Sequence, residues 1–137
     1  MNKINMNPEF VKRMVVDAEN FSQIRKKFFN NENITSQEME YVLSTIPKHK
    51  EINWGPDRLT MVPWNSVEHL QKCIEDTIKK NIDGDFIETG AWRGGMCIVA
   101  KSVYDSLGAN KKVFVADSFE GLPKPDDEKY PDDKNDT

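Results

Sequence analysis

The stretch Glu88-Thr89-Gly90-Ala91-Trp92-Arg93-Gly94-Gly95 decides the fold, because it lies where a short apolar strand turns into an amphipathic helix. Asp85-Phe86-Ile87 precedes it, and a largely apolar run over residues 96–104 follows. A strand, a glycine turn and a helix in this order build a ligand crevice at the carboxyl ends of the strands in open α/β sheets. The glycines let the backbone turn sharply and let the helix begin close to the sheet. We therefore predict a small-molecule site at this turn.

The turn lacks the fingerprint of a dinucleotide site. In G-x-G-x-x-G, bare backbone contacts a pyrophosphate at the helix N-terminus, whereas Ala91, Trp92 and Arg93 follow Gly90 here. Glu88 also places a negative charge where a phosphate would be repelled. A nucleoside ligand that carries a cation and no phosphate fits better, and S-adenosylmethionine is such a ligand. The residues of the turn therefore argue against the hypothesis that this chain is one half of a dinucleotide-binding oxidoreductase.

A second strand ending in an acid is expected about thirty residues on. Lys111-Lys112 lead into the apolar run Val113-Phe114-Val115-Ala116-Asp117, and the helix between the two strands carries Val99, Val103 and Leu107 before a stop at Gly108. An acid at the tip of the second strand of a βαβ unit accepts hydrogen bonds from ribose hydroxyls. The alternative is that Asp117 caps the turn at Ser118-Phe119, and acid-tipped strands also occur in α/β proteins that bind no nucleoside.

Longer stretches resemble the macrolide-sugar O-methyltransferases of the macrocin and mycinamicin type, the TylF-like family. The resemblance is carried by residues 57–62, 85–95, 115–125 and 128–131, within a region of roughly residues 57–137. It implies an α/β fold, a Rossmann-like class I methyltransferase sheet that is incomplete here and is preceded by a helical amino-terminal arm. It also implies methyl transfer from S-adenosylmethionine to a hydroxyl of a sugar or related small molecule. The alternative is a non-catalytic nucleoside-binding or assembly module.

The resemblance implies which residues bind the cofactor. The segment matching Thr60 and Met61 lies beside the cofactor in that family, residues 88–92 wrap its methionine part, and residues 117–121 hold ribose and adenine. We assign Glu88 to the methionine ammonium or nearby charge, and Phe119 to the surroundings of the adenine. Arg93 has two candidate partners, the cofactor carboxylate and an acid in a part of the protein outside this chain. The expected cofactor-binding residues are Thr60, Met61, Glu88, Thr89, Gly90, Ala91, Trp92, Asp117, Ser118, Phe119 and Gly121.

Catalytic and metal-binding residues are not assigned. The family uses magnesium to lower the pKa of the acceptor hydroxyl and to orient it, but its metal ligands and its catalytic base match positions beyond residue 137. We expect this chain alone to be inactive. With only two credible parallel strands, we interpret residues 1–64 as a helical arm and loop, and residues 65–137 as the truncated first part of an S-adenosylmethionine-binding Rossmann-like domain. A complete small domain is the alternative.

The amino-terminal arm is expected to be helical. Thr35 with Glu38 forms a capping box, and Ser66 is expected to cap the helix that precedes the first strand. Trp54 and Trp64 either wall a ligand or pin the arm onto the sheet. One apolar stripe is expected to pack into the core, or alternatively to face a partner subunit in a homo-oligomer. The stripe comprises Phe10, Met14, Phe21, Ile24 and Phe28.

Composition narrows the location and the partners. The net charge of −4 comes from the end of the chain, because eight acids and three lysines lie from Asp117 onward. No basic footprint for nucleic acid remains. No apolar run approaches the roughly 20 residues of a membrane span, and residues 1–8 lack the apolar core of a signal peptide, so we expect a cytoplasmic protein. Cys73 and Cys97 are expected to be reduced thiols, and His49 and His69 to be surface residues.

Overall fold

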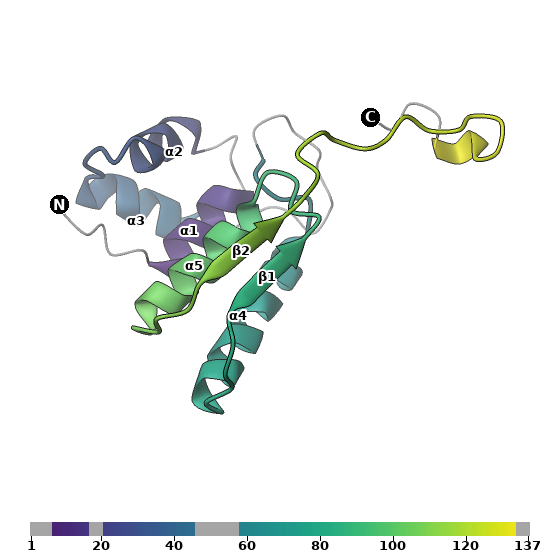
Figure 1. Cartoon of the computed structure of the whole chain (residues 1–137). Coiled ribbons are helices and arrows are strands. Elements are labelled where there is room, and N and C mark those ends of the chain that lie inside the picture. Colours follow the sequence, from purple (N-terminus) through teal and green to yellow (C-terminus); the bar gives the residue numbers. More distant parts are fainter. Residues whose placement is uncertain (1–6, 17–20, 46–57, 134–137) are drawn as a thin grey trace.

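The computed structural model describes residues 7–16, 21–45 and 58–133. Along the described chain four helices precede the first strand, and a further helix follows it and leads to the second strand; Figure 1 shows the two strands side by side. The elements are α1 (Pro8–Val16), α2 (Ser22–Phe29), α3 (Ser36–Ser44), α4 (Trp64–Lys79), β1 (Phe86–Thr89), α5 (Gly95–Ser106), β2 (Val113–Ala116) and the short 3-10 helix η1 (Pro131–Asp133). None of these helices is both long and apolar enough to cross a bilayer.

The strands β1 and β2 form the predicted parallel pair. Phe86 lies opposite Val113 and Thr89 lies opposite Ala116. The Gly90 amide donates to the Ala116 carbonyl at 2.9 Å, so the pairing continues one residue beyond β1. With α5 as the crossover, the described part of the chain contains the βαβ unit that the sequence predicted.

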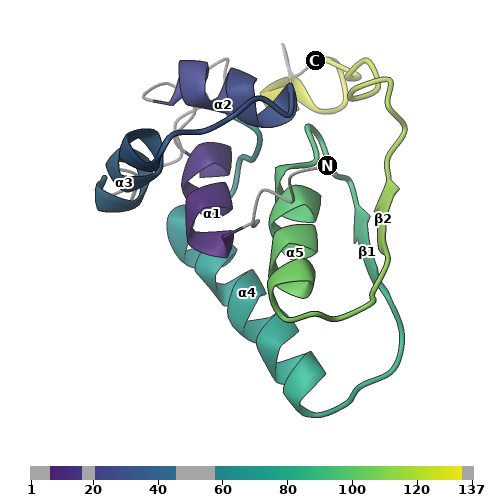
Figure 2. The ribbon, with the colours of Figure 1, turned by 90° about the vertical axis from the view of Figure 1, so that its left-hand side faces the viewer.

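The helices cover one face of this sheet. In Figure 2, α5 lies beside the strands, and α1 and α4 lie beyond it on the same side. On the other face Ile87 and Phe114, which are register partners, remain 61% and 48% exposed. The core joins the arm to the βαβ unit, and its fully buried large side chains include Phe10, Met14, Phe21, Val42, Val67, Val99 and Val103.

The amino-terminal stripe is divided between two helices. Phe10 and Met14 are buried on α1, while Phe21 and Ile24 are buried at the start of α2. Phe21 has φ −115° and ψ 17°, which is not helical, so the prediction of one continuous stripe was wrong in its continuity. Residues 17–20 between the helices lie outside the described part. Burial in a shared core gives the same apolar spacing whether or not the helix is continuous.

Helix ends were predicted with mixed success. The capping box of Thr35 and Glu38 is confirmed, with the Glu38 amide donating to Thr35 Oγ1 at 3.2 Å and the Thr35 amide donating to Glu38 Oε2 at 2.9 Å. The expected cap at Ser66 is wrong, because α4 begins at Trp64 and Pro63 is its N-cap. The Ser66 amide donates to the Pro63 carbonyl at 3.0 Å, which places Ser66 inside the first turn.

Helix α5 ends one residue earlier than its apolar spacing suggests. Val99 and Val103 are fully buried as expected, whereas Leu107 is the C-cap and is 45% exposed. The sequence placed Leu107 on the helix, whereas the structure places it directly after the last helical residue, Ser106. Gly108 follows with φ +64°, which confirms the predicted stop.

Candidate functional site

Asp117 binds the glycine turn to the end of the neighbouring strand. Its Oδ2 accepts hydrogen bonds from the amides of Ala91 at 2.7 Å and Trp92 at 3.1 Å. Its Oδ1 accepts from the Phe119 amide at 3.0 Å. These bonds, led by that of the Phe119 amide and then that of Trp92, hold the pKa of the Asp117 carboxyl below its ordinary value. The structure thus brings together the two acid-containing segments that the sequence singled out.

These bonds limit what Asp117 can offer a ligand. An ionised carboxylate has about four lone-pair positions, and three backbone amides already occupy three of them. The Ser118 hydroxyl lies 3.5 Å from Oδ1 as a further neighbour. Asp117 therefore caps the turn at Ser118-Phe119, which was the alternative that the sequence left open, and it also binds the amides of Ala91 and Trp92. The role of Asp117 in accepting ribose hydroxyls stays a prediction, with room for about one hydroxyl unless an existing bond is shared.

The glycine turn uses left-handed backbone at several positions. Gly90 and Gly94 have φ +75° and φ +73°, and Trp92 has φ +49° although it carries a side chain. A non-glycine residue in that region is strained, and such strain is concentrated at functional sites. No atom lies within 4 Å of the place where a Cβ on Gly90 would be. The turn therefore presents open backbone surface at Gly90, as the predicted close approach of a ligand requires.

Residues 58–62, which we call the bridging segment, lie against this turn. The Gly95 amide donates to the Leu59 carbonyl at 2.9 Å, and Arg93 Nη1 donates to the Arg58 carbonyl at 2.9 Å. The bridging segment also contacts α1, because the Leu59 amide donates to the Val15 carbonyl at 3.2 Å. Two consecutive carbonyls are thus held by the start of α5 and the residues just before it.

Thr60 and Met61 belong to the bridging segment, and their place beside the cofactor stays a prediction. Thr60 is buried and its Oγ1 accepts from the Val62 amide at 3.3 Å, while Met61 is half-buried. Both partners suggested for Arg93 lie outside the described residues, so that assignment stays a prediction. Besides its bond to the bridging segment, its guanidinium lies over the Trp92 ring, 4.4 Å from the centroid. Trp64 packs beneath Lys12 and Arg13 of α1, in agreement with the pinning alternative, and Trp54 lies outside the described residues.

Glu88 has a partner that sequence reasoning did not identify. Its Oε2 accepts a hydrogen bond from the Cys97 thiol, with 2.8 Å between sulfur and oxygen. Cys97 lies in the first turn of α5 and is a buried free thiol. Burial, and then the bond and charge of Glu88, raise the pKa of the thiol to about 12. In β1, Phe86 and Glu88 are the less exposed residues, so Glu88 shares a face of the strand with Phe86.

Residues 118–121 form a tight exposed loop. Ser118 Oγ accepts from the Glu120 amide at 3.3 Å and donates to the Gly121 carbonyl at 3.3 Å. Phe119 has φ +57° and Gly121 has φ +80°. The Phe119 side chain is 73% exposed. Its proposed contact with the adenine stays a prediction.

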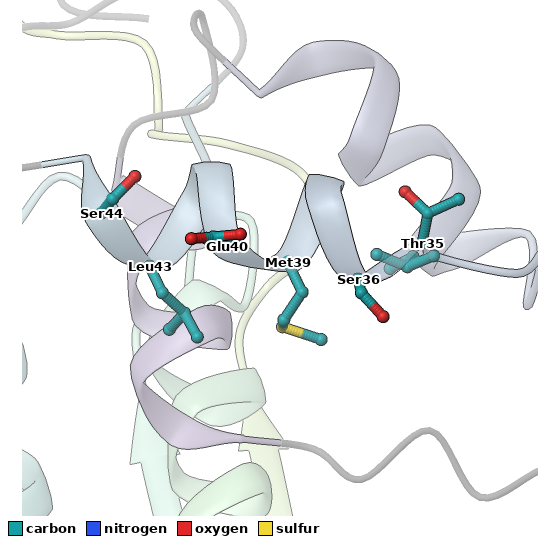
Figure 3. Close-up of a pocket in the computed structure, with 7 residues that line it drawn as sticks. Thr35, Ser36, Met39, Glu40, Leu43 and Ser44 are labelled. Atoms are coloured by element: carbon teal, nitrogen blue, oxygen red, sulfur yellow. The ribbon is translucent and has the colours of Figure 1, made fainter.

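Two hollows of the described surface lie away from this turn. One, of about 590 Å³, runs along α3, where Met39 and Leu43 point to the same side of the helix (Figure 3). The other, of about 220 Å³, is lined by Gly84, Asp85 and Lys111 at the amino ends of the strands. The candidate site, in contrast, is an open surface at the carboxyl ends.

The described residues contain no cluster of side chains that could bind magnesium. Across residues 7–16, 21–45 and 58–133, no group of three or more His, Cys, Asp or Glu could hold a metal ion. The family resemblance implies metal ligands beyond residue 137, and magnesium stays a prediction.

Comparison with known proteins identifies the family. The family model described as Macrocin-O-methyltransferase (TylF) matches residues 3–137. The demethyldecarbamoylnovobiocin O-methyltransferase of Streptomyces niveus is 36% identical over 83 residues, which is 60% of this chain and 32% of the relative. The mycinamicin III 3''-O-methyltransferase of Micromonospora griseorubida is 40% identical over 73 residues, 53% of this chain and 29% of the relative. The matched region therefore spans about a third of the curated relatives.

A solved structure supports the fold assignment. The structure of the O-methyltransferase NovP aligns with a TM-score of 0.50 and 39% sequence identity, over 52% of this chain and 30% of that chain. The βαβ unit and its helical arm therefore form part of a Rossmann-like methyltransferase fold, as the sequence predicted. The division at residue 64 stays a prediction.

Proposed function

The chain belongs to the TylF family of macrocin O-methyltransferases, and on that premise we propose that the protein transfers the methyl group of S-adenosylmethionine to a hydroxyl of a sugar or related small molecule. Residues 1–137 contribute the front portion of its cofactor site. One observation carries the proposal: Asp117, at the end of β2, is hydrogen-bonded to the glycine turn that follows β1. The two segments that a nucleoside would contact are thus already held together.

The charges of the described residues agree with this cofactor. S-adenosylmethionine carries a sulfonium and an ammonium, and when bound it supplies the methyl group. Glu88 and Asp117 place two carboxylates at neighbouring strand ends, and Gly90 leaves open backbone between them. Glu88 would attract the ammonium and Asp117 would accept from a ribose hydroxyl. The bridging segment would border the site through its residues Thr60 and Met61.

The proposal has parts that depend on residues outside this chain. These parts are magnesium and the catalytic base. The relatives named above are sugar or antibiotic O-methyltransferases by name, which favours a small-molecule acceptor. A cytoplasmic enzyme is part of the same proposal.

The test uses the full-length protein. Titration calorimetry with S-adenosylhomocysteine should show binding, and mass spectrometry should show methylation of a deoxysugar-bearing acceptor in preference to a phenolic one. Binding without methylation of any hydroxyl would favour the non-catalytic module. Absence of binding at millimolar ligand would refute the proposed cofactor.

A further inference from the structure

The contact between Glu88 and Cys97 joins the end of a strand to the first turn of the next helix. Glu88 is half-buried on β1 and faces α5, and Cys97 is 6% exposed on α5. The thiol donates to Oε2 across 2.8 Å. Cys73, the other cysteine, is exposed and lies 3.5 Å from His69 Nε2.

The thiol at this position can act only as a donor toward Glu88. Its raised pKa keeps the proton on sulfur at neutral pH, and a carboxylate accepts but cannot donate when ionised. The bond to Oε2 restricts the rotamers of the Glu88 side chain before any ligand binds. Without the bond, the entropy cost of ordering this side chain would be paid on binding. A carboxylate ordered before binding makes a stronger contact with a cation.

We propose that Cys97 is a positioning residue, whose thiol orients the Glu88 carboxylate toward the methionine ammonium of S-adenosylmethionine. This inference rests on the proposed function. A merely structural alternative is that Cys97 fills space between β1 and α5, and then the contact with Glu88 has no effect on the ligand.

The test compares two ligands on the full-length protein. S-adenosylhomocysteine carries the ammonium, whereas 5′-methylthioadenosine has the same adenosine and thioether but no ammonium. Cys97→Ala should weaken binding of S-adenosylhomocysteine by about tenfold, the scale of one hydrogen bond to a charged group, and leave 5′-methylthioadenosine binding unchanged. Cys97→Ser keeps a donor and should recover most of the loss. Cys73→Ala is the matched control and should change neither affinity.

The outcomes separate this inference from the proposed function. If the wild type binds both ligands and Cys97→Ala weakens both equally, or neither, the positioning role is overturned and the cofactor assignment survives. A wild type that binds neither ligand overturns both. If Cys97→Ala does not fold, the infrared S–H stretch in the Cys73→Ala background tests the contact directly. That stretch should move to higher frequency in Glu88→Gln, because the bond weakens, and an unchanged frequency would refute the inference.

Discussion

Gly95→Ala is the substitution that the packing of the site excludes most clearly. A Cβ on Gly95 would lie 2.3 Å from the Leu59 carbonyl oxygen, 2.6 Å from its carbon and 2.8 Å from Val15 Cγ1. Two of these atoms are backbone, so a rotamer change cannot relieve the clash. The bridging segment would have to move away from α5 and lose the bond from the Gly95 amide to the Leu59 carbonyl.

The magnitude follows from opposing contributions. Overpacking a close contact costs about 1–3 kcal/mol, and loss of the hydrogen bond costs about 0.5–1.5 kcal/mol. The better helix propensity of alanine offsets at most about 1 kcal/mol. We expect the free energy of unfolding to fall by about 2 kcal/mol. Because Thr60 and Met61 belong to the displaced segment, affinity for S-adenosylhomocysteine should fall as well.

Urea denaturation of the full-length variant, followed by circular dichroism, measures this loss, and titration calorimetry measures the affinity. Gly108→Ala is the matched control: φ is +64° and nothing lies within 4 Å of its Cβ position. It should lose only the left-handed backbone penalty of about 1 kcal/mol and keep its affinity. If Gly95→Ala is no less stable than Gly108→Ala and binds the ligand normally, the tight contact with the bridging segment is refuted.

Three further predictions concern hydrogen bonds, two of them at the candidate site and one in the amino-terminal arm. Asp117→Ala should weaken S-adenosylhomocysteine binding by about one to two orders of magnitude, the scale of one hydrogen bond to a charged group, and should also lower stability, with Asp117→Asn milder in both; calorimetry and urea unfolding that show a stability loss alone would reduce Asp117 to a turn cap. Arg93→Ala frees the Arg58 carbonyl and should weaken binding several-fold with an unchanged far-ultraviolet spectrum, whereas unaltered affinity would exclude a role for this bond. The Lys27 side chain, followed by the Thr35 amide, lowers the pKa of Glu38 to about 2. Glu38 therefore stabilises the fold above its unfolded pKa of about 4.5, and this stabilisation disappears as the pH falls toward 2. Glu38→Gln should flatten the stability profile in that window, and urea unfolding curves that match the wild type at every pH would contradict this.

The βαβ unit could be predicted because each of its signals is local. The apolar runs, the glycine turn and the stop at Gly108 are read within a few residues, and the structure confirms them. The start of α4 was misplaced for a reason that is also local. Ser66 is a common N-cap residue, but the ring of Pro63 fixes its φ, and the helix begins directly after it, at Trp64.

The contacts that hold the site together could not be predicted in the same way. The amides bound to Asp117 and the carbonyls of Arg58 and Leu59 are backbone groups, and any residue would supply them. The bond between Glu88 and Cys97 depends on how the first turn of α5 approaches β1. Such approaches are set by packing between elements and leave no residue pattern in the sequence.

The most direct test of the central claim is a crystal structure of the full-length protein with S-adenosylhomocysteine. We expect a ribose hydroxyl within hydrogen-bond distance of Asp117, the methionine part along residues 88–92, and Thr60 and Met61 beside the ligand. A ligand bound elsewhere, with Asp117 still bonded only to the amides of Ala91, Trp92 and Phe119, would contradict that claim.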